Sequence, residues 1–123
     1  MAKKILIVDD ENILLEPLSK KFKEEGFEVE MASNGEEGFK KALEILPDLI
    51  ILDVAMPKVN GLEMLAKIRK NEKGKDMKVI ILTNVNEIEK IEDAVKDGAS
   101  EYLVKVEWSL ENLVKKVKSK FGM

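Results

Sequence analysis

The chain has 123 residues, of which 37% are charged and 45% hydrophobic, and it contains neither cysteine nor histidine. This length predicts one domain, and the missing residue types exclude a disulfide framework, thiolate chemistry and the usual ligands of zinc, copper and haem. The net charge of −3 is too small to indicate nucleic acid or an anionic membrane as the main partner. No apolar run is long enough for a membrane span or a signal peptide, so a soluble cytoplasmic protein is expected.

Along the chain, the first predicted strand is the apolar run Ile5–Val8, typical of a strand covered by helices on both faces. A helix is expected over about residues 12–25. Pro17 removes one backbone hydrogen bond there, which predicts a slight bend or a delayed start. In Phe27–Met31 apolar and acidic residues alternate, which indicates an edge strand.

The second helix is expected after Ser33-Asn34-Gly35-Glu36, which has the spacing of a capping box, and it stops before Pro47. The apolar run Leu49–Leu52 predicts the third strand. A third helix is marked by apolar residues at helical spacing, from Leu62 to Ile68.

The apolar run Val79–Leu82 predicts a fourth, central strand. A fourth helix is expected between a cap at Asn86 and a stop at Gly98. The mixed segment Glu101–Val104 suits the second edge strand, and a fifth helix follows a cap at Ser109.

Five strands alternating with five helices predict parallel strands, right-handed crossovers and a three-layer α/β sandwich. With the second and fifth strands at the edges, the simplest doubly wound order is 2-1-3-4-5. The connection then reverses direction between the first and third strands. Such a reversal opens a crevice at the carboxyl ends of these strands, where a site is expected.

Polar side chains follow four of the strands at this rim. Asp9 and Asp10 follow the first strand and Asp53 the third, while Thr83 and Lys105 follow the fourth and the fifth. Each alone has a structural explanation, such as a favourable charge before a helix, but complementary groups at four strand ends favour a functional site. Crowded carboxylates recruit a cation, and oxygen ligands suit Mg²⁺. Such a rim suits phosphoryl transfer onto a carboxylate, with Asp53 as the best nucleophile candidate.

These residues, together with Met56-Pro57 and Gly61, resemble the receiver domain of two-component response regulators over essentially the whole chain. The resemblance implies the flavodoxin-like, CheY-like sheet order. It also implies that Asp53 accepts a phosphoryl group from a sensor histidine kinase or a small phosphodonor. Asp10, Asp53 and the backbone carbonyl of Ala55 would bind Mg²⁺ directly, and Asp9 would act through water.

The resemblance further implies a conformational switch. Lys105 would pair with the phosphoryl group, Thr83 would move to donate a hydrogen bond to it, and Tyr102 would be the switch aromatic. Output to a downstream protein partner would use the fourth helix, fifth strand and fifth helix, and homodimerisation through the same surface stays open. Since the chain ends directly after the fifth helix, residues 1–123 are expected to be a single receiver domain without an output domain, contacting neither nucleic acid nor membrane.

The sequence departs from the family pattern at two positions. Val106 replaces the proline that usually follows the lysine in a cis bond, so a trans bond and a re-formed loop are expected. Asn84 replaces a small residue and narrows access to the site. Because Ala55 and Val85 offer no polar group to position a water, slow self-dephosphorylation is expected from a stoichiometric switch that is not a turnover enzyme.

Three alternatives stay open from the sequence. Val106 and Asn84 motivate a divergent receiver that acts as a phosphorylation-independent interaction module. An aspartate-based phosphohydrolase would need a second acid two residues after the nucleophile, where Ala55 stands. A flavin-binding module would need a hydroxyl- and glycine-rich loop after the first strand, in place of the acidic Asp9-Asp10-Glu11.

Overall fold

In the computed structural model, residues 3–9, 12–53, 61–83, 101–104 and 110–122 are described. Within them the elements are β1 (Lys4–Val8), α1 (Asn12–Glu24), β2 (Glu28–Ala32), α2 (Gly35–Ile45), β3 (Leu49–Asp53), α3 (Gly61–Lys70), β4 (Lys78–Thr83), β5 (Glu101–Val104) and α5 (Leu110–Lys120). The helix expected between Asn86 and Gly98 and the cap at Ser109 lie outside the described residues.

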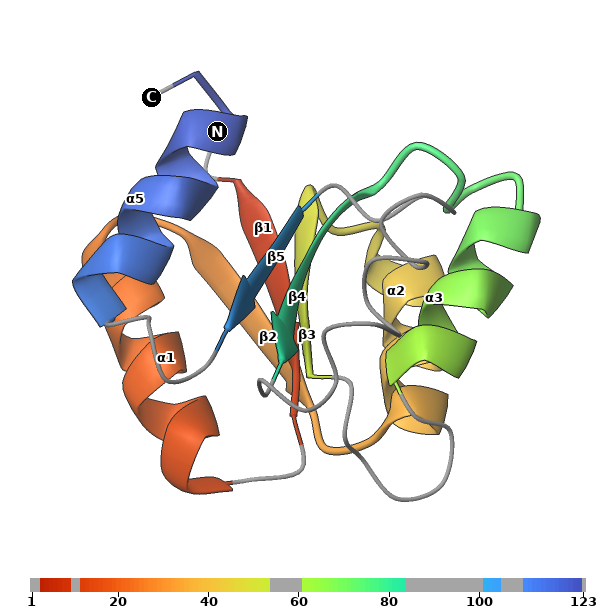
Figure 1. The fold of residues 1–123 in the computed structure, drawn as a ribbon, viewed down its shortest axis with the longest axis horizontal. Coiled ribbons are helices and arrows are strands. Elements are labelled where there is room, and N and C mark those ends of the chain that lie inside the picture. Colours follow the sequence, from red (N-terminus) through yellow and green to blue (C-terminus); the bar gives the residue numbers. More distant parts are fainter. Residues whose placement is uncertain (1–2, 10–11, 54–60, 84–100, 105–109, 123) are drawn as a thin grey trace.

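The strands form one parallel sheet in the order β2-β1-β3-β4-β5, which confirms the predicted doubly wound α/β topology (Figure 1). Helices α1 and α5 lie on one face of this sheet, and α2 and α3 lie on the other. The chain therefore forms three layers, and β1 and β3 are neighbours at the point where the strand order reverses.

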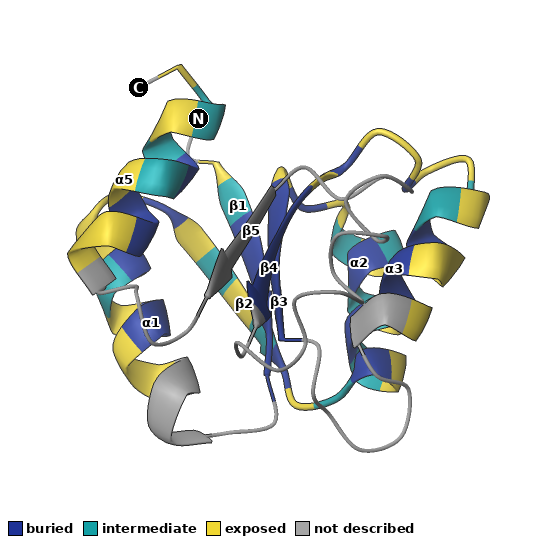
Figure 2. Ribbon diagram, in the orientation of Figure 1, coloured by how far each residue is buried: buried dark blue, intermediate teal, exposed yellow. Residues whose placement is uncertain are grey.

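The core consists of two apolar clusters, one on each face of the sheet. On the α1–α5 face, Phe22 and Val117 pack with inward residues such as Ile7 and Ile51. On the α2–α3 face, Met64 and Ile68 belong to a cluster with the alternate strand residues, such as Leu6, Val8 and Ile50. Figure 2 shows the central strands buried and the outer helix surfaces exposed. This two-sided burial is the reason that β1, β3 and β4 carry unbroken apolar runs.

Helix α1 begins at Asn12 and continues through Pro17 to Glu24, so the helix start is not delayed by the proline. The edge assignment of residues 27–31 is confirmed, since Glu28 and Glu30 are exposed while Val29 and Met31 are half-buried.

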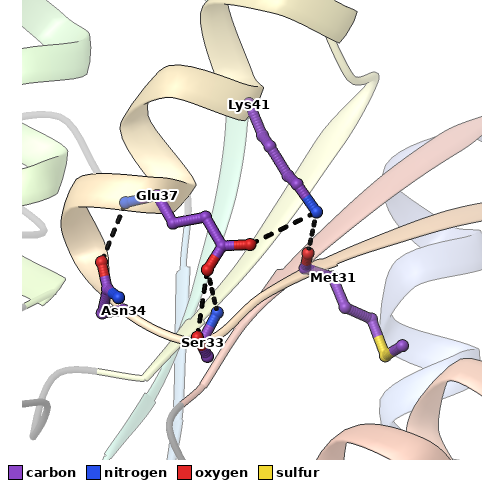
Figure 3. Close-up of polar contacts among 5 residues, drawn as sticks. All are labelled: Met31, Ser33, Asn34, Glu37 and Lys41. Carbon is purple, nitrogen blue, oxygen red and sulfur yellow. Dashed lines mark hydrogen bonds and ion pairs between the residues drawn. The ribbon is translucent and has the colours of Figure 1, made fainter.

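The predicted capping box of α2 is wrong by one residue. Asn34 is the N-cap, and its Oδ1 accepts a hydrogen bond of 2.9 Å from the backbone N–H of Glu37 (Figure 3). Glu37, not Glu36, returns to the chain before the helix, where its Oε2 accepts hydrogen bonds from the backbone N–H and the hydroxyl of Ser33. Asparagine caps as well as serine does, and the extended backbone of Asn34 selects it as the first residue outside the helix.

Candidate functional site

The site is built around two aspartates at the carboxyl ends of adjacent strands. Val8 of β1 is paired with Leu52 of β3, Asp9 comes directly after Val8, and Asp53 is the last residue of β3. The backbone N–H of Asp9 donates to the carbonyl of Ala32 at 3.1 Å, so Asp9 continues the ladder between β1 and β2. Asp9 and Asp53 therefore lie at the same level of the sheet.

Both aspartates are almost fully buried, with 1% of Asp9 and 2% of Asp53 exposed to solvent. Burial of two carboxylates on neighbouring strands is costly unless positive charge compensates them. Their donor atoms are all oxygen, the ligand type that Mg²⁺ prefers. Asp9 and Asp53 therefore fit one side of a site for a hard divalent cation.

A group of three acidic residues that could hold a metal ion is absent from the described residues. The third predicted carboxylate, Asp10, lies outside them, and so does Ala55, whose carbonyl is the other expected ligand. Lys105, Val106 and Asn84 also lie outside the described residues. The geometry available for the metal site is thus that of Asp9 and Asp53.

Thr83 and Tyr102 are placed by their backbones. Asp53 is paired with Leu82 of β4, so Thr83 is one residue beyond the level of Asp53 on the adjacent strand. Thr83 is paired in turn with Val104, the last residue of β5, and Tyr102 is paired with Ile81. Three adjacent strands thus end within one residue of each other, which brings Asp53 and Thr83 to the same rim.

A polar network at the start of α2 lies beside this rim and was not predicted from the sequence. Lys41 donates a hydrogen bond from Nζ to the carbonyl of Met31, and Nζ is 3.5 Å from Oε1 of Glu37 (Figure 3). The hydrogen bonds from Ser33 lower the pKa of Glu37, with Lys41 adding a smaller effect in the same direction. The spacing of Glu37 and Lys41, four residues apart on one helix, is the signal that could have indicated the ion pair.

Residues 5–118 match the model of the family described as the response regulator receiver domain. The chain is 41% identical over 102 residues to the transcriptional regulatory protein CusR of Escherichia coli, covering 83% of this chain and 44% of that protein. It is 31% identical over 116 residues to the DNA-binding dual master transcriptional regulator RpaA of Synechocystis, covering 94% of this chain and 48% of RpaA. The chain spans about half the length of these curated relatives.

Among solved structures, the chemotaxis response regulator CheY4 of Vibrio cholerae is similar, with a TM-score of 0.89, 32% identity and coverage of 97% of this chain and 98% of that chain. A CheY-like receiver domain protein of Methanospirillum hungatei gives a TM-score of 0.89 at 32% identity, covering 98% of this chain and 94% of that one.

None of the helices within the described part of the chain is long and apolar enough to cross a bilayer. The sheet order, the two buried aspartates at the switch point and the family match over residues 5–118 agree with one another. The chain therefore belongs to the response regulator receiver domain family of two-component signalling.

Proposed function

We propose that this chain is a phosphorylation-dependent switch and that Asp53 is its phosphoacceptor. The observation that supports this most directly is the burial of Asp53 beside Asp9 at the carboxyl end of the central strand β3. A carboxylate at this position lies at the rim where the strands end, and its burial shields it from bulk water. Its chemistry is that of a stoichiometric acceptor, because the product is an acyl phosphate on the protein itself.

In the proposed transfer, a carboxylate oxygen of Asp53 forms a bond to phosphorus while the bond from phosphorus to the donor breaks. The electron pair of that bond leaves with the donor, which is a phosphohistidine of a sensor histidine kinase or a small acyl phosphate. Asp10, Asp53 and the carbonyl of Ala55 would hold Mg²⁺, with Asp9 contributing through water. The chemistry that Mg²⁺ supplies in such a site is neutralisation of charge on the phosphoryl oxygens.

Lys105 and Thr83 complete the proposed site. The ammonium of Lys105 would pair with the phosphoryl group, and the hydroxyl of Thr83 would donate a hydrogen bond to it. The strand register supports the role of Thr83, because its backbone lies one residue beyond the level of Asp53. Tyr102, two residues before the end of β5, is the proposed aromatic switch that reports the change.

The proposed partners are a sensor histidine kinase and a downstream protein that contacts the helix expected over 86–98, β5 and α5. Homodimerisation through that surface stays an open question for this chain. Action without an attached output domain and without direct nucleic-acid contact stays a prediction. The relatives CusR and RpaA, which their names describe as regulators of transcription, are about twice as long as the matched region.

The test is intact-mass measurement after incubation with acetyl phosphate and Mg²⁺. The expected result is a gain in mass of one phosphoryl group in the wild type. No adduct should form when a chelator of Mg²⁺ is present during the incubation, and none should form on Asp53→Asn. Asp48→Asn is the matched control, because Asp48 lies beside the opposite end of β3 and the variant keeps a side-chain oxygen to accept from the backbone N–H of Lys4. This control should be phosphorylated like the wild type.

An adduct that survives Asp53→Asn would assign the acceptor to another residue. A wild type without any adduct would instead favour the phosphorylation-independent interaction module. Turnover of a small phosphate ester or a bound yellow flavin would overturn the proposal in favour of the phosphohydrolase or the flavin module. A phosphoryl group lost within seconds in the purified protein would contradict the expected slow self-dephosphorylation.

A further inference from the structure

The outer side of β2 is an open strand edge. Among the residues that the structure describes, β1 is the only strand paired with β2. The backbone N–H of Glu28 donates to the carbonyl of Lys3 at 2.9 Å, and the carbonyl of Ala32 accepts from Asp9, so these residues face inward to β1. Backbone groups of successive strand residues point to opposite sides. The N–H and C=O groups of Val29 and Met31 therefore face outward.

Within the described part of the chain, one side chain covers this edge, and it does so at the carboxyl end. Lys41 reaches from α2 to the outward carbonyl of Met31 and is held there by Glu37 (Figure 3). This lysine occupies a group that a neighbouring strand would otherwise use, which is a common way to protect a strand edge. The strand contains neither proline nor glycine to break further pairing. Among the described residues, the N–H and C=O of Val29 and the N–H of Met31 thus form the open part of the edge.

The two sides of the edge differ in chemistry. Glu28 and Glu30 are exposed together on one side of the strand. Val29 and Met31 alternate with them and pack against the cluster beneath α1. Two adjoining hollows border the strand, because Lys23 lines both. The larger, of about 860 Å³, lies between α1 and β2 and is mostly apolar, with Pro17 and Met31 in its lining. The smaller, of about 530 Å³, is mostly polar, with Glu28 and Glu30 in its lining beside Phe27 and Val29.

We propose that the outer edge of β2 binds an extended segment of a partner protein as an additional strand, with apolar and basic residues alternating along that segment. Its backbone would pair with Val29. Its apolar side chains would enter the larger hollow beside α1, and its basic side chains would lie against Glu28 and Glu30, which line the smaller one. Strand addition derives affinity from backbone hydrogen bonds and specificity from alternate side chains. Here the exposed Glu28 and Glu30 favour basic side chains at alternate positions, while Lys23, which lines both hollows, favours apolar side chains in the positions between them.

The charge pattern also argues against a second copy of this chain as the occupant. Pairing of β2 with β2 would bring Glu28 and Glu30 against the same glutamates of the other copy. Like charges directly opposite each other across a strand pair are destabilising. This surface uses none of the residues of the proposed phosphorylation site, so its test is made on the unphosphorylated protein without Mg²⁺.

The test uses a synthetic peptide of alternating valine and lysine, about nine residues long so that it extends past both ends of the five-residue strand β2. Its binding to the full chain is followed by amide NMR shifts and hydrogen exchange. The expected result is saturable binding with the largest shifts and added protection at Val29. The same peptide with N-methyl groups along one edge of its backbone should fail to bind, because it cannot form the ladder. Weak or absent saturation, or shifts centred on Asp9 and Asp53, would overturn the proposal.

Two sets of variants separate strand addition from simple charge attraction. Val29→Pro removes an outward N–H that β1 does not use, and it should weaken binding about fivefold or more, whereas Val29→Thr should bind like the wild type. The double variant Glu28→Lys with Glu30→Lys should lose the lysine peptide and gain a valine-glutamate peptide. This reversal of the preferred peptide tests the proposal even if Val29→Pro fails to fold. Binding unaffected by these changes, or dimerisation through β2 in place of peptide binding, would refute it.

Discussion

Asp9 and Asp53 lie side by side at the ends of two parallel strands, each directly after one member of the pair Val8 and Leu52. Both are almost completely buried. Two carboxylates in a region from which water is largely excluded attract a cation strongly, and their oxygen atoms suit Mg²⁺. The folded state is therefore expected to be sensitive to divalent cations.

Asp9→Asn removes one of these charges while keeping the shape of the side chain. It should weaken Mg²⁺ binding, because one of the two negative charges that attract the cation is lost. Mg²⁺ should stabilise the wild type by about 1.4 kcal/mol for each tenfold excess over its Kd, and it should stabilise Asp9→Asn less. Urea unfolding with and without Mg²⁺ measures both effects. A variant that Mg²⁺ stabilises as much as it stabilises the wild type would contradict this account, and Asp48→Asn is the control.

Gly38 allows α2 to approach the sheet closely. A Cβ atom at this position would lie 2.9 Å from Sδ of Met64 and 2.9 Å from both terminal methyl carbons of Val8. Helix propensity favours alanine over glycine by about 1 kcal/mol, but overpacking in a core costs about 1–3 kcal/mol. Gly38→Ala should therefore lower the free energy of unfolding by about 1 kcal/mol. Urea unfolding tests this, with the exposed Lys40→Ala on the same helix as control. If Gly38→Ala were more stable than the wild type, the side chains of Met64 and Val8 would be able to make room for the added methyl group without loss of packing energy.

Leu46 ends α2 in a left-handed conformation, with φ of 49° and ψ of 65°. Leucine adopts this region at a cost of about 1–2 kcal/mol, which asparagine largely avoids. Because half of the Leu46 side chain is exposed, its replacement loses little burial. Leu46→Asn should raise the free energy of unfolding by about 0.5–1 kcal/mol in a thermal or urea melt. Glu44→Asn, two residues earlier and within the helix, should lower the free energy of unfolding, because asparagine has a lower helix propensity than glutamate. A loss of stability in Leu46→Asn would mean that packing of the leucine outweighs the strain.

Glu37 gives the fold an acid-dependent contribution. Hydrogen bonds from Ser33 hold the pKa of Glu37 below its usual value, so the unfolded chain takes up the proton first as the pH falls. Its stabilisation is complete above about pH 5 and is lost as the pH falls from about 4.3 through the lower pKa of the folded state. Glu37→Gln should cost about 1 kcal/mol at neutral pH, a modest value because the side chain is partly exposed, and the cost should shrink in acid.

Urea unfolding of both proteins at a series of pH values provides the measurement for Glu37. Glu36→Gln removes a charge from the same helical turn and leaves the hydrogen bonds of Ser33 in place. Across the pH series, its free energy of unfolding should differ less from that of the wild type than the value for Glu37→Gln does. If Glu36→Gln were the more destabilised of the two, Glu36 and not Glu37 would be the residue whose side chain accepts hydrogen bonds from the chain before α2, as the sequence had predicted.

Much of the fold could be predicted from local patterns. The apolar runs at Ile5–Val8 and Leu49–Leu52 identified the central strands because burial on both faces leaves no polar position. The alternation in residues 27–31 identified the edge for the opposite reason. Together with the rule of right-handed crossovers, these patterns led to the observed strand order. The one-residue error at Asn34 arose because serine and asparagine cap equally well, and only the backbone conformation distinguishes them.

The chemical types available at the rim could be read directly from the chain, since each strand carries its own terminal residue. The sequence could not determine that Asp9 and Asp53 share one level and are both buried, because that depends on the register between strands over 40 residues apart in the chain. Nor could it show that Lys41 reaches the carbonyl of Met31 and leaves Val29 open at the sheet edge. Those relationships exist only after the layers pack, since the register of β1 with β3 and the position of α2 against the sheet are properties of the assembled fold.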